Sequence, residues 1–461
     1  MSIKVGYLPL YIKLYDDSNP ATRVGLDRYS KTLQDMIRAF DIEVVASPTC
    51  RIKPEFEAAI ELFHRENVDA IVTQHLAYSP SLESIDALEK AGVPLIVLDT
   101  TPDYALLDMA GYQSGIMPNH GIHGVQDMCN LLKRRGIEYY LCVGHAMHSD
   151  VIAQVAGMCR AAAAAKAYKT ARVGSVGGSF TGMGDFLVSD EDYKEKIGAE
   201  VSYMDTETVK EYLPKVTDEE IEREIALDKA NFEFDLTDEA AYREAVRSGL
   251  AVRKWADDNR LTALTVNFLT LDICGLPKMP FTECSKTMVR GLGYAGEGDV
   301  LTAGLVGALR SVYHDTTFTE MFCPDWKEDV ILLSHMGEIN YDLAQWKPVL
   351  RTVPFNYNTC GDTAAAYTCY RPGKAVFVNV APAKTGFSLI ATNVELLDCG
   401  LRHGAYKYAV QGWMKPEKPL TEFLKEFSEL GGTHHSAMIY NADIEEILAF
   451  GRMMGFEVHR I

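Results

Sequence analysis

Three short segments of the chain combine glycine with side chains that can do acid–base or metal chemistry. Glu297 lies in GLGYAGEGD, and Glu338 follows the strand-like run VILLSHMG. The third segment, GGTHHS, places His434 and His435 after two glycines. Carboxylates can act as general acids and bases, and imidazole is a common metal ligand. Because glycine lets the backbone turn tightly beside these groups, each segment is a candidate part of a functional site.

Each segment also has a simpler interpretation. Glu297 can be a surface turn carboxylate, and Glu338 can be a solvated residue at the end of a strand. His335, three residues before Glu338, is equally compatible with a packed or hydrogen-bonded histidine. Adjacent residues of an extended chain point to opposite sides, so we expect at most one of His434 and His435 to face a given site.

Other glycine-rich and histidine-rich segments lack the context that their motifs require. Gly291, Gly293 and Gly296 form a literal G-x-G-x-x-G, but it follows the helix-like SKTMVR and has no acidic ribose-binding partner. No dinucleotide site is therefore predicted, and Asp299 is expected to cap the next helix. The loop GGSFTGMGDF has no P-loop lysine and is expected to line a site. The histidine pairs in NHGIHG and GHAMH have no cysteine or carboxylate pattern that would complete a zinc site.

The composition excludes several classes of protein. Of the 461 residues, 45 are Lys or Arg and 64 are Asp or Glu, which gives a net charge of −19 and argues against nucleic acid or anionic lipid as a partner. No apolar run reaches the roughly 18–20 residues of a membrane helix, and the start resembles no secretory signal. The ten cysteines form no C-x-x-C pair, as is typical of a reducing compartment. We therefore expect a cytoplasmic enzyme of small molecules with no membrane partner.

The elements that must position these segments follow from apolar periodicity. Apolar runs beginning at Ile3, Ile42, Asp69, Pro94 and Tyr139 alternate with amphipathic helices, which predicts an α/β fold with an N-terminal doubly wound parallel sheet. Further strand and helix patterns predict a second α/β domain, and the last third predicts a mostly antiparallel β domain. The expected domains are 1–170, 171–320 carrying Glu297, and 321–461 carrying Glu338 and His435.

The three candidate segments occur in an order that resembles the L-arabinose isomerase and L-fucose isomerase family of metal-dependent aldose–ketose isomerases. GLGYAGEGDVLTA is similar to GYGFAGEGDWKTA of arabinose isomerases, SHMGE to SHMLE, and GGTHHS to GGAHHT. The resemblance extends over the whole chain through weaker matches: AYSP resembles FSPA, IHGVQDM resembles AHGGREF, and GSVGGSFTGMGD corresponds to the CRFGDNM loop.

The resemblance implies a set of site residues and a chemistry. Glu297, Glu338 and His435 match the metal ligands, and the two glutamates would also serve as acid and base. The positions that match the sugar-lining residues of the family are His123, Met183 and Phe268. The implied cofactor is Mn²⁺, with Mg²⁺ or Co²⁺ possible, because hard carboxylates and one imidazole suit these ions. The family also implies a homo-oligomer, a trimer or a hexamer, with its active site at a subunit interface.

Two departures from the arabinose isomerase motifs concern the identity of the sugar substrate. Pro354, in KPVLRTVP, stands where arabinose isomerases have a further histidine ligand in DVQH, and Leu8 replaces the glutamine of GSQHLY. These changes favour a different or modified sugar substrate, for instance one bearing an anionic group. They also leave open an alternative, a sugar-binding or regulatory protein of the same fold that lacks turnover.

Overall fold

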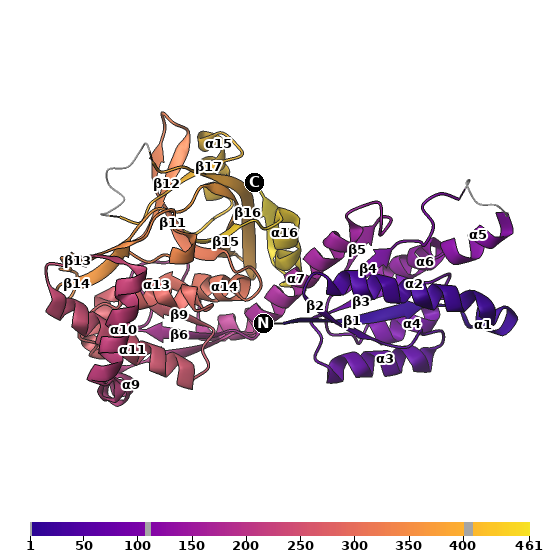
Figure 1. Cartoon of the computed structure of the whole chain (residues 1–461), viewed down its shortest axis with the longest axis horizontal. Coiled ribbons are helices and arrows are strands. Elements are labelled where there is room, and N and C mark those ends of the chain that lie inside the picture. Colours follow the sequence, from indigo (N-terminus) through magenta and orange to yellow (C-terminus); the bar gives the residue numbers. More distant parts are fainter. Residues whose placement is uncertain (1, 107–111, 401–408) are drawn as a thin grey trace. The chain divides into compact units, whose positions relative to one another are not determined.

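The computed structural model describes residues 2–106, 112–400 and 409–461. The chain folds into two compact units, Met1–Ala163 and Ala164–Ile461, and the division falls inside helix α7 (Val151–Lys169) (Figure 1). The α/β class expected from the sequence is confirmed, while a further boundary near residue 320 stays a prediction. Within the described part of the chain, no helix combines the length and apolar composition needed to cross a bilayer.

The first unit is built on a five-stranded parallel sheet in the order β2-β1-β3-β4-β5. The strands β3 and β4 are fully buried, as the near-continuous apolar runs predicted. The strands are β1 (Ile3–Leu10), β2 (Ile42–Ala46), β3 (Ala70–His75), β4 (Leu95–Asp99) and β5 (Tyr139–Val143). The helices are α1 (Lys13–Ser18), α2 (Pro20–Arg38), α3 (Lys53–Arg65), α4 (Ser81–Leu88), α5 (Tyr112–Asn119) and α6 (Ile122–Arg134).

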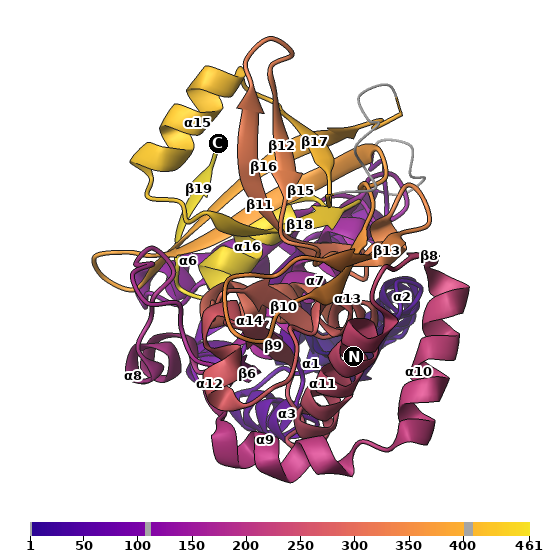
Figure 2. The ribbon, with the colours of Figure 1, turned by 90° about the vertical axis from the view of Figure 1, so that its left-hand side faces the viewer.

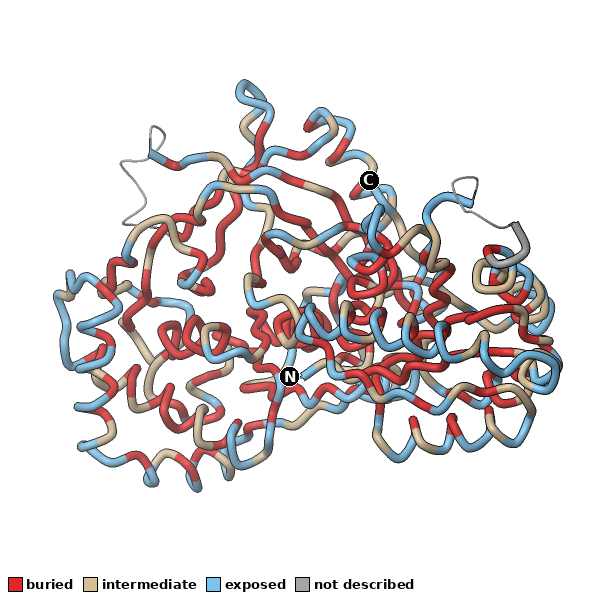
Figure 3. The backbone as a smooth tube through the Cα atoms, turned by 45° about the vertical axis from the view of Figure 1, so that its right-hand side comes forward, coloured by how far each residue is buried: buried red, intermediate tan, exposed pale blue. Residues whose placement is uncertain are grey.

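Amphipathic helices cover this sheet with one apolar face each. In α3 the buried residues Phe56, Ile60 and Phe63 recur at three- and four-residue spacing and join a core that includes Ile71 of β3. Figure 3 shows the same alternation along many helices, whose turns change from buried to exposed, whereas the central strands are buried along their length. The hydrophobic pattern therefore accounts for the layers of the unit.

The second unit contains a four-stranded parallel sheet in the order β10-β9-β6-β7. Its strands are β6 (Arg172–Val176), β7 (Glu200–Met204), β9 (Ala263–Val266) and β10 (Gly293–Gly296). The helices of this part are α8 (Asp190–Asp192), α9 (Thr206–Tyr212), α10 (Asp218–Asn231), α11 (Glu239–Asp258), α12 (Leu271–Cys274), α13 (Phe281–Val289) and α14 (Val300–Arg310). A small sheet in the order β14-β13-β8 lies beside them and contains β8 (Glu233–Asp235), β13 (Val349–Val353) and β14 (Thr363–Tyr367).

Six antiparallel strands of the second unit close into a barrel in the order β15-β18-β11-β12-β17-β16, because β16 also pairs with β15. The strands are β11 (Thr316–Asp325), β12 (Val330–Ser334), β15 (Gly373–Pro382), β16 (Phe387–Leu397), β17 (Gly412–Pro416) and β18 (His435–Tyr440). Strand β19 (Glu457–Arg460) adds to β16 in parallel, and helices α15 (Leu420–Glu429) and α16 (Ile444–Met453) complete this part. The mostly antiparallel β region expected for the last third is confirmed.

Helix α14 joins the parallel sheet to the barrel. All of its residues are buried, and it packs on β6, β9 and β10 with one side and on β11, β15 and β18 with another. Both views show it between these two sets of strands (Figures 1 and 2). The turn that carries Glu297 leads directly into this helix, so the sheet and the barrel meet where the candidate site lies.

Candidate metal centre

Five ionisable side chains of the second unit gather just after β10 and β12, at the start of β18 and in the middle of β11. They form two groups of potential metal ligands, and in each group one donor atom per residue lies within 4.8 Å of the others. One group is Glu297, His434 and His435, and the other is Glu320, His335 and His435. His435 belongs to both groups, so the five side chains surround one region.

The register of the barrel places Glu320 between the two histidine segments. On one side Glu320 of β11 is the direct partner of His435 of β18, and on the other side it is the partner of Ser334, the residue before His335. Directly opposed residues on neighbouring antiparallel strands have their Cβ atoms about 4.5–5.5 Å apart. Strand pairing alone thus brings a carboxylate next to two imidazoles.

The glycines around Glu297 allow its turn to lie against its neighbours. Glu297 itself has φ +63° and Gly298 has φ +81°, so the chain makes the tight turn that the sequence predicted. A Cβ atom at Gly296 would lie 2.6 Å from Cε1 of His335, and one at Gly298 would lie 2.2 Å from the carbonyl oxygen of Gly178. A side chain at either position would therefore displace a part of the site.

One ring nitrogen of His435 contacts a carboxylate, and the other has no hydrogen-bond partner among the described residues. Its Nδ1 lies 3.0 Å from Oδ2 of Asp299, and neither side chain is exposed. The cap predicted for Asp299 is confirmed, since its Oδ1 accepts from the backbone N–H of Thr302 at 2.8 Å. Nε2 of His435 is buried without a hydrogen-bond partner among the described residues and lies 3.6 Å from Oε2 of Glu297. Because a buried polar atom without a partner is costly, this nitrogen is a candidate metal-binding atom.

His335 is oriented in the same way by Glu338. Its Nδ1 lies 2.7 Å from Oε2 of Glu338, whose Oε1 accepts from the hydroxyl of Tyr294 at 2.9 Å. Burial would lower the pKa of His335, but the charge and hydrogen bond of Glu338 outweigh it and raise the pKa. Nε2 of His335 lies on the other side of the ring, 4.0 Å from Oε2 of Glu320. Glu338 therefore lies behind His335 and belongs to neither donor group.

His434 also faces Glu297, so the expectation that only one histidine of the pair would do so is wrong. Oε2 of Glu297 lies 3.6 Å from Nε2 of both His434 and His435. The alternation of side chains does not apply, because His434 precedes β18 and only His435 is part of the strand. Asp185 fixes His434 by accepting from its backbone N–H at 3.0 Å and lying 2.6 Å from its Nδ1. Burial would lower the pKa of His434, but hydrogen bonds with Glu297 and Asp185 raise it to about 9.

The donor set fits a hard divalent cation. Two carboxylates, Glu297 and Glu320, and the Nε2 atoms of His335 and His435 face the same region. A metal-bound histidine commonly donates its other ring N–H to a carboxylate, as His335 and His435 do here. Oxygen and imidazole ligands together suit Mn²⁺ and related ions better than soft thiophilic metals.

The residues expected to line a sugar lie in two places. The backbone N–H of Phe180 donates to the carbonyl of Glu297 at 3.0 Å, and that of Met183 donates to the carbonyl of Phe180. The ring of Phe268 lies 5.6 Å from that of Phe180. Met183 and Phe268 are therefore close to the Glu297 turn, whereas His123 lies in the first unit, exposed at the start of α6.

Of the three expected ligands, the structure brings Glu297 and His435 together. It places Glu338 on the far side of the His335 ring, outside both donor groups. The residue that the sequence reasoning missed is Glu320, and His335 was considered only as a packed or hydrogen-bonded residue. A signal for Glu320 exists in the sequence, because TFTEMF puts a carboxylate on the same face of a strand as Phe318. Without the strand pairing, however, nothing connects that carboxylate to the histidines.

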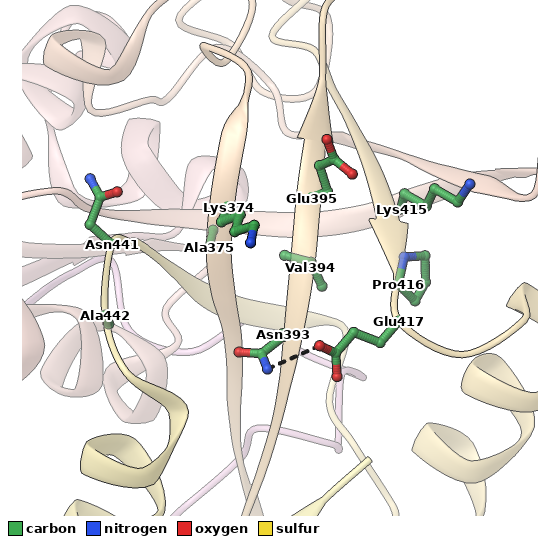
Figure 4. Close-up of a pocket in the computed structure, with 10 residues that line it drawn as sticks. All are labelled: Lys374, Ala375, Asn393, Val394, Glu395, Lys415, Pro416, Glu417, Asn441 and Ala442. Atoms are coloured by element: carbon green, nitrogen blue, oxygen red, sulfur yellow. Dashed lines mark hydrogen bonds between the residues drawn. The ribbon is translucent and has the colours of Figure 1, made fainter.

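A separate pocket of about 370 Å³ lies on the outside of the barrel and shares no residue with this centre (Figure 4). Its walls come from β15, β16, β17 and the residues before α16, and Nδ2 of Asn393 donates to Oε1 of Glu417 across it at 3.1 Å. Its two lysines, Lys374 and Lys415, are balanced by Glu395 and Glu417, so the pocket has no net charge that would select an ion.

Two family models and three curated relatives that match this chain are those of L-arabinose isomerases. Residues 187–315 match the model of the L-arabinose isomerase central domain, and residues 315–457 match that of the L-arabinose isomerase C-terminal domain. The chain is 26% identical to the L-arabinose isomerase of Oceanobacillus iheyensis, over 86% of this chain and 85% of that protein. It is also 26% identical to those of Clostridium beijerinckii (85% and 81%) and Levilactobacillus brevis (86% and 85%).

Proposed function

The chain belongs to the L-arabinose isomerase family, and on this premise we propose that it is a metal-dependent aldose–ketose isomerase. The observation that carries the metal centre is the buried Nε2 of His435, which lacks a partner among the described residues while Asp299 holds the other ring nitrogen. We propose Glu297, Glu320, His335 and His435 as the ligands, and Mn²⁺ as the metal, with Mg²⁺ or Co²⁺ as possible substitutes.

The ligand set proposed here keeps Glu297 and His435 of the set predicted from the sequence. Glu338 is assigned a different task, because its two oxygens are already engaged by His335 and Tyr294. It would orient His335 and raise the basicity of the ring, as carboxylates behind metal-bound histidines do. Glu320 takes its place among the donors, since it is the cross-strand partner of His435.

Conversion of an aldose to its ketose moves one proton between C1 and C2 and another between their oxygens. A bound divalent cation would supply Lewis-acid polarisation of the carbonyl. Glu297 and Glu320 are the carboxylates that face the common region, so one can exchange the carbon-bound proton and the other the hydroxyl proton. Phe268 and Met183, close to the Glu297 turn, would line the sugar and restrict access of water.

The family resemblance also supports proposals on the oligomeric state, the cellular compartment and the substrate of the enzyme. We propose a homo-oligomer, a trimer or a hexamer, in which the first unit of one subunit brings His123 to a neighbour's site. We further propose that the enzyme works in the cytoplasm on a small sugar. Leu8 and Pro354 support a substrate other than arabinose, because both stand where arabinose isomerases have residues of the site.

The test is the substitution Glu297→Gln, with Glu395→Gln on the outer surface of the barrel as its matched control. Formation of ketose from a panel of aldoses is measured with Mn²⁺ and after chelation. Loss of one carboxylate that both binds the metal and moves a proton should lower kcat by at least about 100-fold, while the control keeps its activity. Full activity of Glu297→Gln would overturn the proposal. If Mn²⁺ raises the melting temperature of the wild type but no aldose is converted, the chain is a binder and not an enzyme.

A further inference from the structure

The glycine-rich loop between β6 and α8, residues 177–189, contacts two of the segments that carry proposed metal ligands. In its first half, the backbone N–H of Phe180 donates to the carbonyl of Glu297 at 3.0 Å, and the hydroxyl of Ser179 donates to the carbonyl of Gly298 at 3.4 Å. Its second half reaches the two histidines at the start of β18. One loop therefore joins the Glu297 turn to the start of this barrel strand.

Glycines let this loop double back between the two segments. Gly177, Gly178 and Gly182 have φ angles of +82°, +74° and +101°, in the left-handed region that other residues rarely adopt. The loop is thus bent where it leaves β6 and again between its two halves. These bends bring Asp185, near the end of GGSFTGMGDF, to the histidines.

A single carboxylate oxygen of Asp185 fixes His434. Oδ2 of Asp185 accepts from the backbone N–H of His434 at 3.0 Å and lies 2.6 Å from Nδ1 of its ring. The next residue, Phe186, is buried, and its ring stacks on that of His435 with 5.2 Å between centroids and 10° between planes. Because this neighbouring ring anchors the chain, the carboxylate is held in place before any ligand binds.

The ring of His434 transmits this constraint to Glu297. With Nδ1 engaged by Asp185, the opposite nitrogen Nε2 faces Glu297 and lies 3.6 Å from its Oε2. Nε2 of His435 lies at the same distance from the same oxygen. Two imidazoles thus flank one carboxylate oxygen, and a separate carboxylate fixes each imidazole, Asp299 for His435 and Asp185 for His434.

We propose that Asp185 is a positioning residue of the metal centre. It holds the ring of His434, and this ring holds the Glu297 carboxylate in the orientation that binds the metal. Asp185 itself belongs to neither donor group. Partners behind a metal ligand fix the orientation in which the ligand meets the metal, and their loss commonly lowers metal affinity or activity about 10- to 100-fold. This assignment rests on the metal centre proposed above and adds a residue on which its affinity depends.

The test compares Asp185→Ala with Asp185→Asn. Both contacts to His434 are made by one oxygen, so the amide oxygen of asparagine can take over both, whereas alanine removes them. Mn²⁺ affinity is measured by calorimetric titration, and kcat for aldose conversion is measured at saturating Mn²⁺. Melting temperatures establish that each variant folds. Glu191→Ala is the matched control, because it removes an exposed carboxylate of α8 only six residues further along.

Asp185→Ala should lower both the Mn²⁺ affinity and kcat about tenfold, at the lower end of the range for such partners. Asp185→Asn should stay within about threefold of the wild type in both quantities, and Glu191→Ala should behave as the wild type. In a His434→Ala background, Asp185→Ala should lower the affinity by no more than about twofold further, because the ring through which Asp185 acts is gone.

Equal losses in Asp185→Asn and Asp185→Ala would assign the effect to charge and overturn the positioning role, as would an unchanged affinity in Asp185→Ala. The full tenfold loss in the His434→Ala background would overturn the route through His434. In each of these cases the isomerase function stands. If the variants differ in Mn²⁺ affinity as expected but no aldose is converted by the wild type, the positioning role stands and the isomerase function falls. A wild type that binds no Mn²⁺ overturns the metal centre and the role of Asp185 together.

Discussion

Asp299 connects the start of helix α14 to the imidazole of His435. Its Oδ1 accepts from the backbone N–H of Thr302 at 2.8 Å, and its Oδ2 lies 3.0 Å from Nδ1 of His435. Both side chains are fully buried. One carboxylate thus caps a helix that packs on both the sheet and the barrel, and at the same time turns Nε2 of His435 toward Glu297.

The substitution Asp299→Asn should separate these two tasks. The single amide oxygen can still cap α14, since asparagine is a good N-cap, but the amide NH₂ then faces Nδ1 of His435. Nδ1 must become an acceptor, the proton moves to Nε2, and the ring can no longer bind a metal through that atom. We expect the affinity for Mn²⁺, measured by calorimetric titration, to fall about 10- to 100-fold. Unchanged affinity in a folded Asp299→Asn protein would contradict this role.

The substitutions Glu320→Gln and Glu338→Gln should lower the affinity for Mn²⁺ by different amounts. Glu320→Gln removes a proposed ligand, whereas Glu338→Gln removes only the partner of His335 Nδ1. We therefore expect the larger loss of Mn²⁺ affinity for Glu320→Gln, with a loss of about 10- to 100-fold for Glu338→Gln. The measurement is the same titration, with the surface variant Glu395→Gln as the reference. The opposite order of the two losses would restore Glu338 as a direct ligand, as the resemblance to the isomerase family implied.

His75 should make the free energy of unfolding of the protein fall in acid. It is the last residue of β3, its ring packs against Gly124, and neither ring nitrogen has a hydrogen-bond partner among the described residues. Burial lowers the pKa of His75 to about 3, and the charge of Asp127 opposes this without reversing it. Below the unfolded pKa of about 6.5, only the unfolded chain binds this proton, so His75 lowers stability by about 1.4 kcal/mol per pH unit as the pH falls toward 3.

Urea unfolding of the wild type and of His75→Phe at pH 7, 6, 5 and 4 measures this contribution. The His75→Phe variant keeps a planar ring beside Gly124 but cannot bind a proton. Its free energy of unfolding should therefore fall less steeply in acid, by about 1.4 kcal/mol per pH unit, which corresponds to one proton. His75→Leu provides a second non-titrating side chain if the larger ring disturbs packing. His64→Gln, at an exposed histidine, should retain the wild-type slope. Equal slopes in wild type and both His75 variants would refute the assignment.

Lys286 should be important for stability because it is the cation between two buried carboxylates. Its ammonium lies 2.7 Å from Glu224 and 2.5 Å from Asp228, and all three side chains are at least nine-tenths buried. Burial raises the pKa of Asp228 even with Lys286 beside it, which shows how little water reaches this carboxylate. Lys286→Met should cost about 3–5 kcal/mol in urea unfolding, since it leaves a buried carboxylate without its cation. Lys194→Met, which breaks an exposed pair with Glu200, should cost no more than about 1 kcal/mol.

Local order along the chain was predictable from the sequence. The strands that begin at Ile3 and Ile42, the turn at Glu297 and the cap at Asp299 are all found where the residue pattern predicted them. Each of these features depends on the backbone preferences and hydrophobic periodicity of a few consecutive residues, which the sequence displays directly. The antiparallel character of the last third was predictable for the same reason.

The sequence by itself thus determined the α/β class and the order of the elements, and its resemblance to arabinose isomerases implied two of the residues, Glu297 and His435, that face the candidate metal centre. Only the tertiary structure decided that Glu320 joins them and that Glu338 lies behind His335. The reason is physical: the proposed ligands come from segments far apart in the chain, and the side of each imidazole that faces the centre depends on strand register and on a second partner. Register is fixed by the closure of the whole barrel, and no short run of residues contains that information.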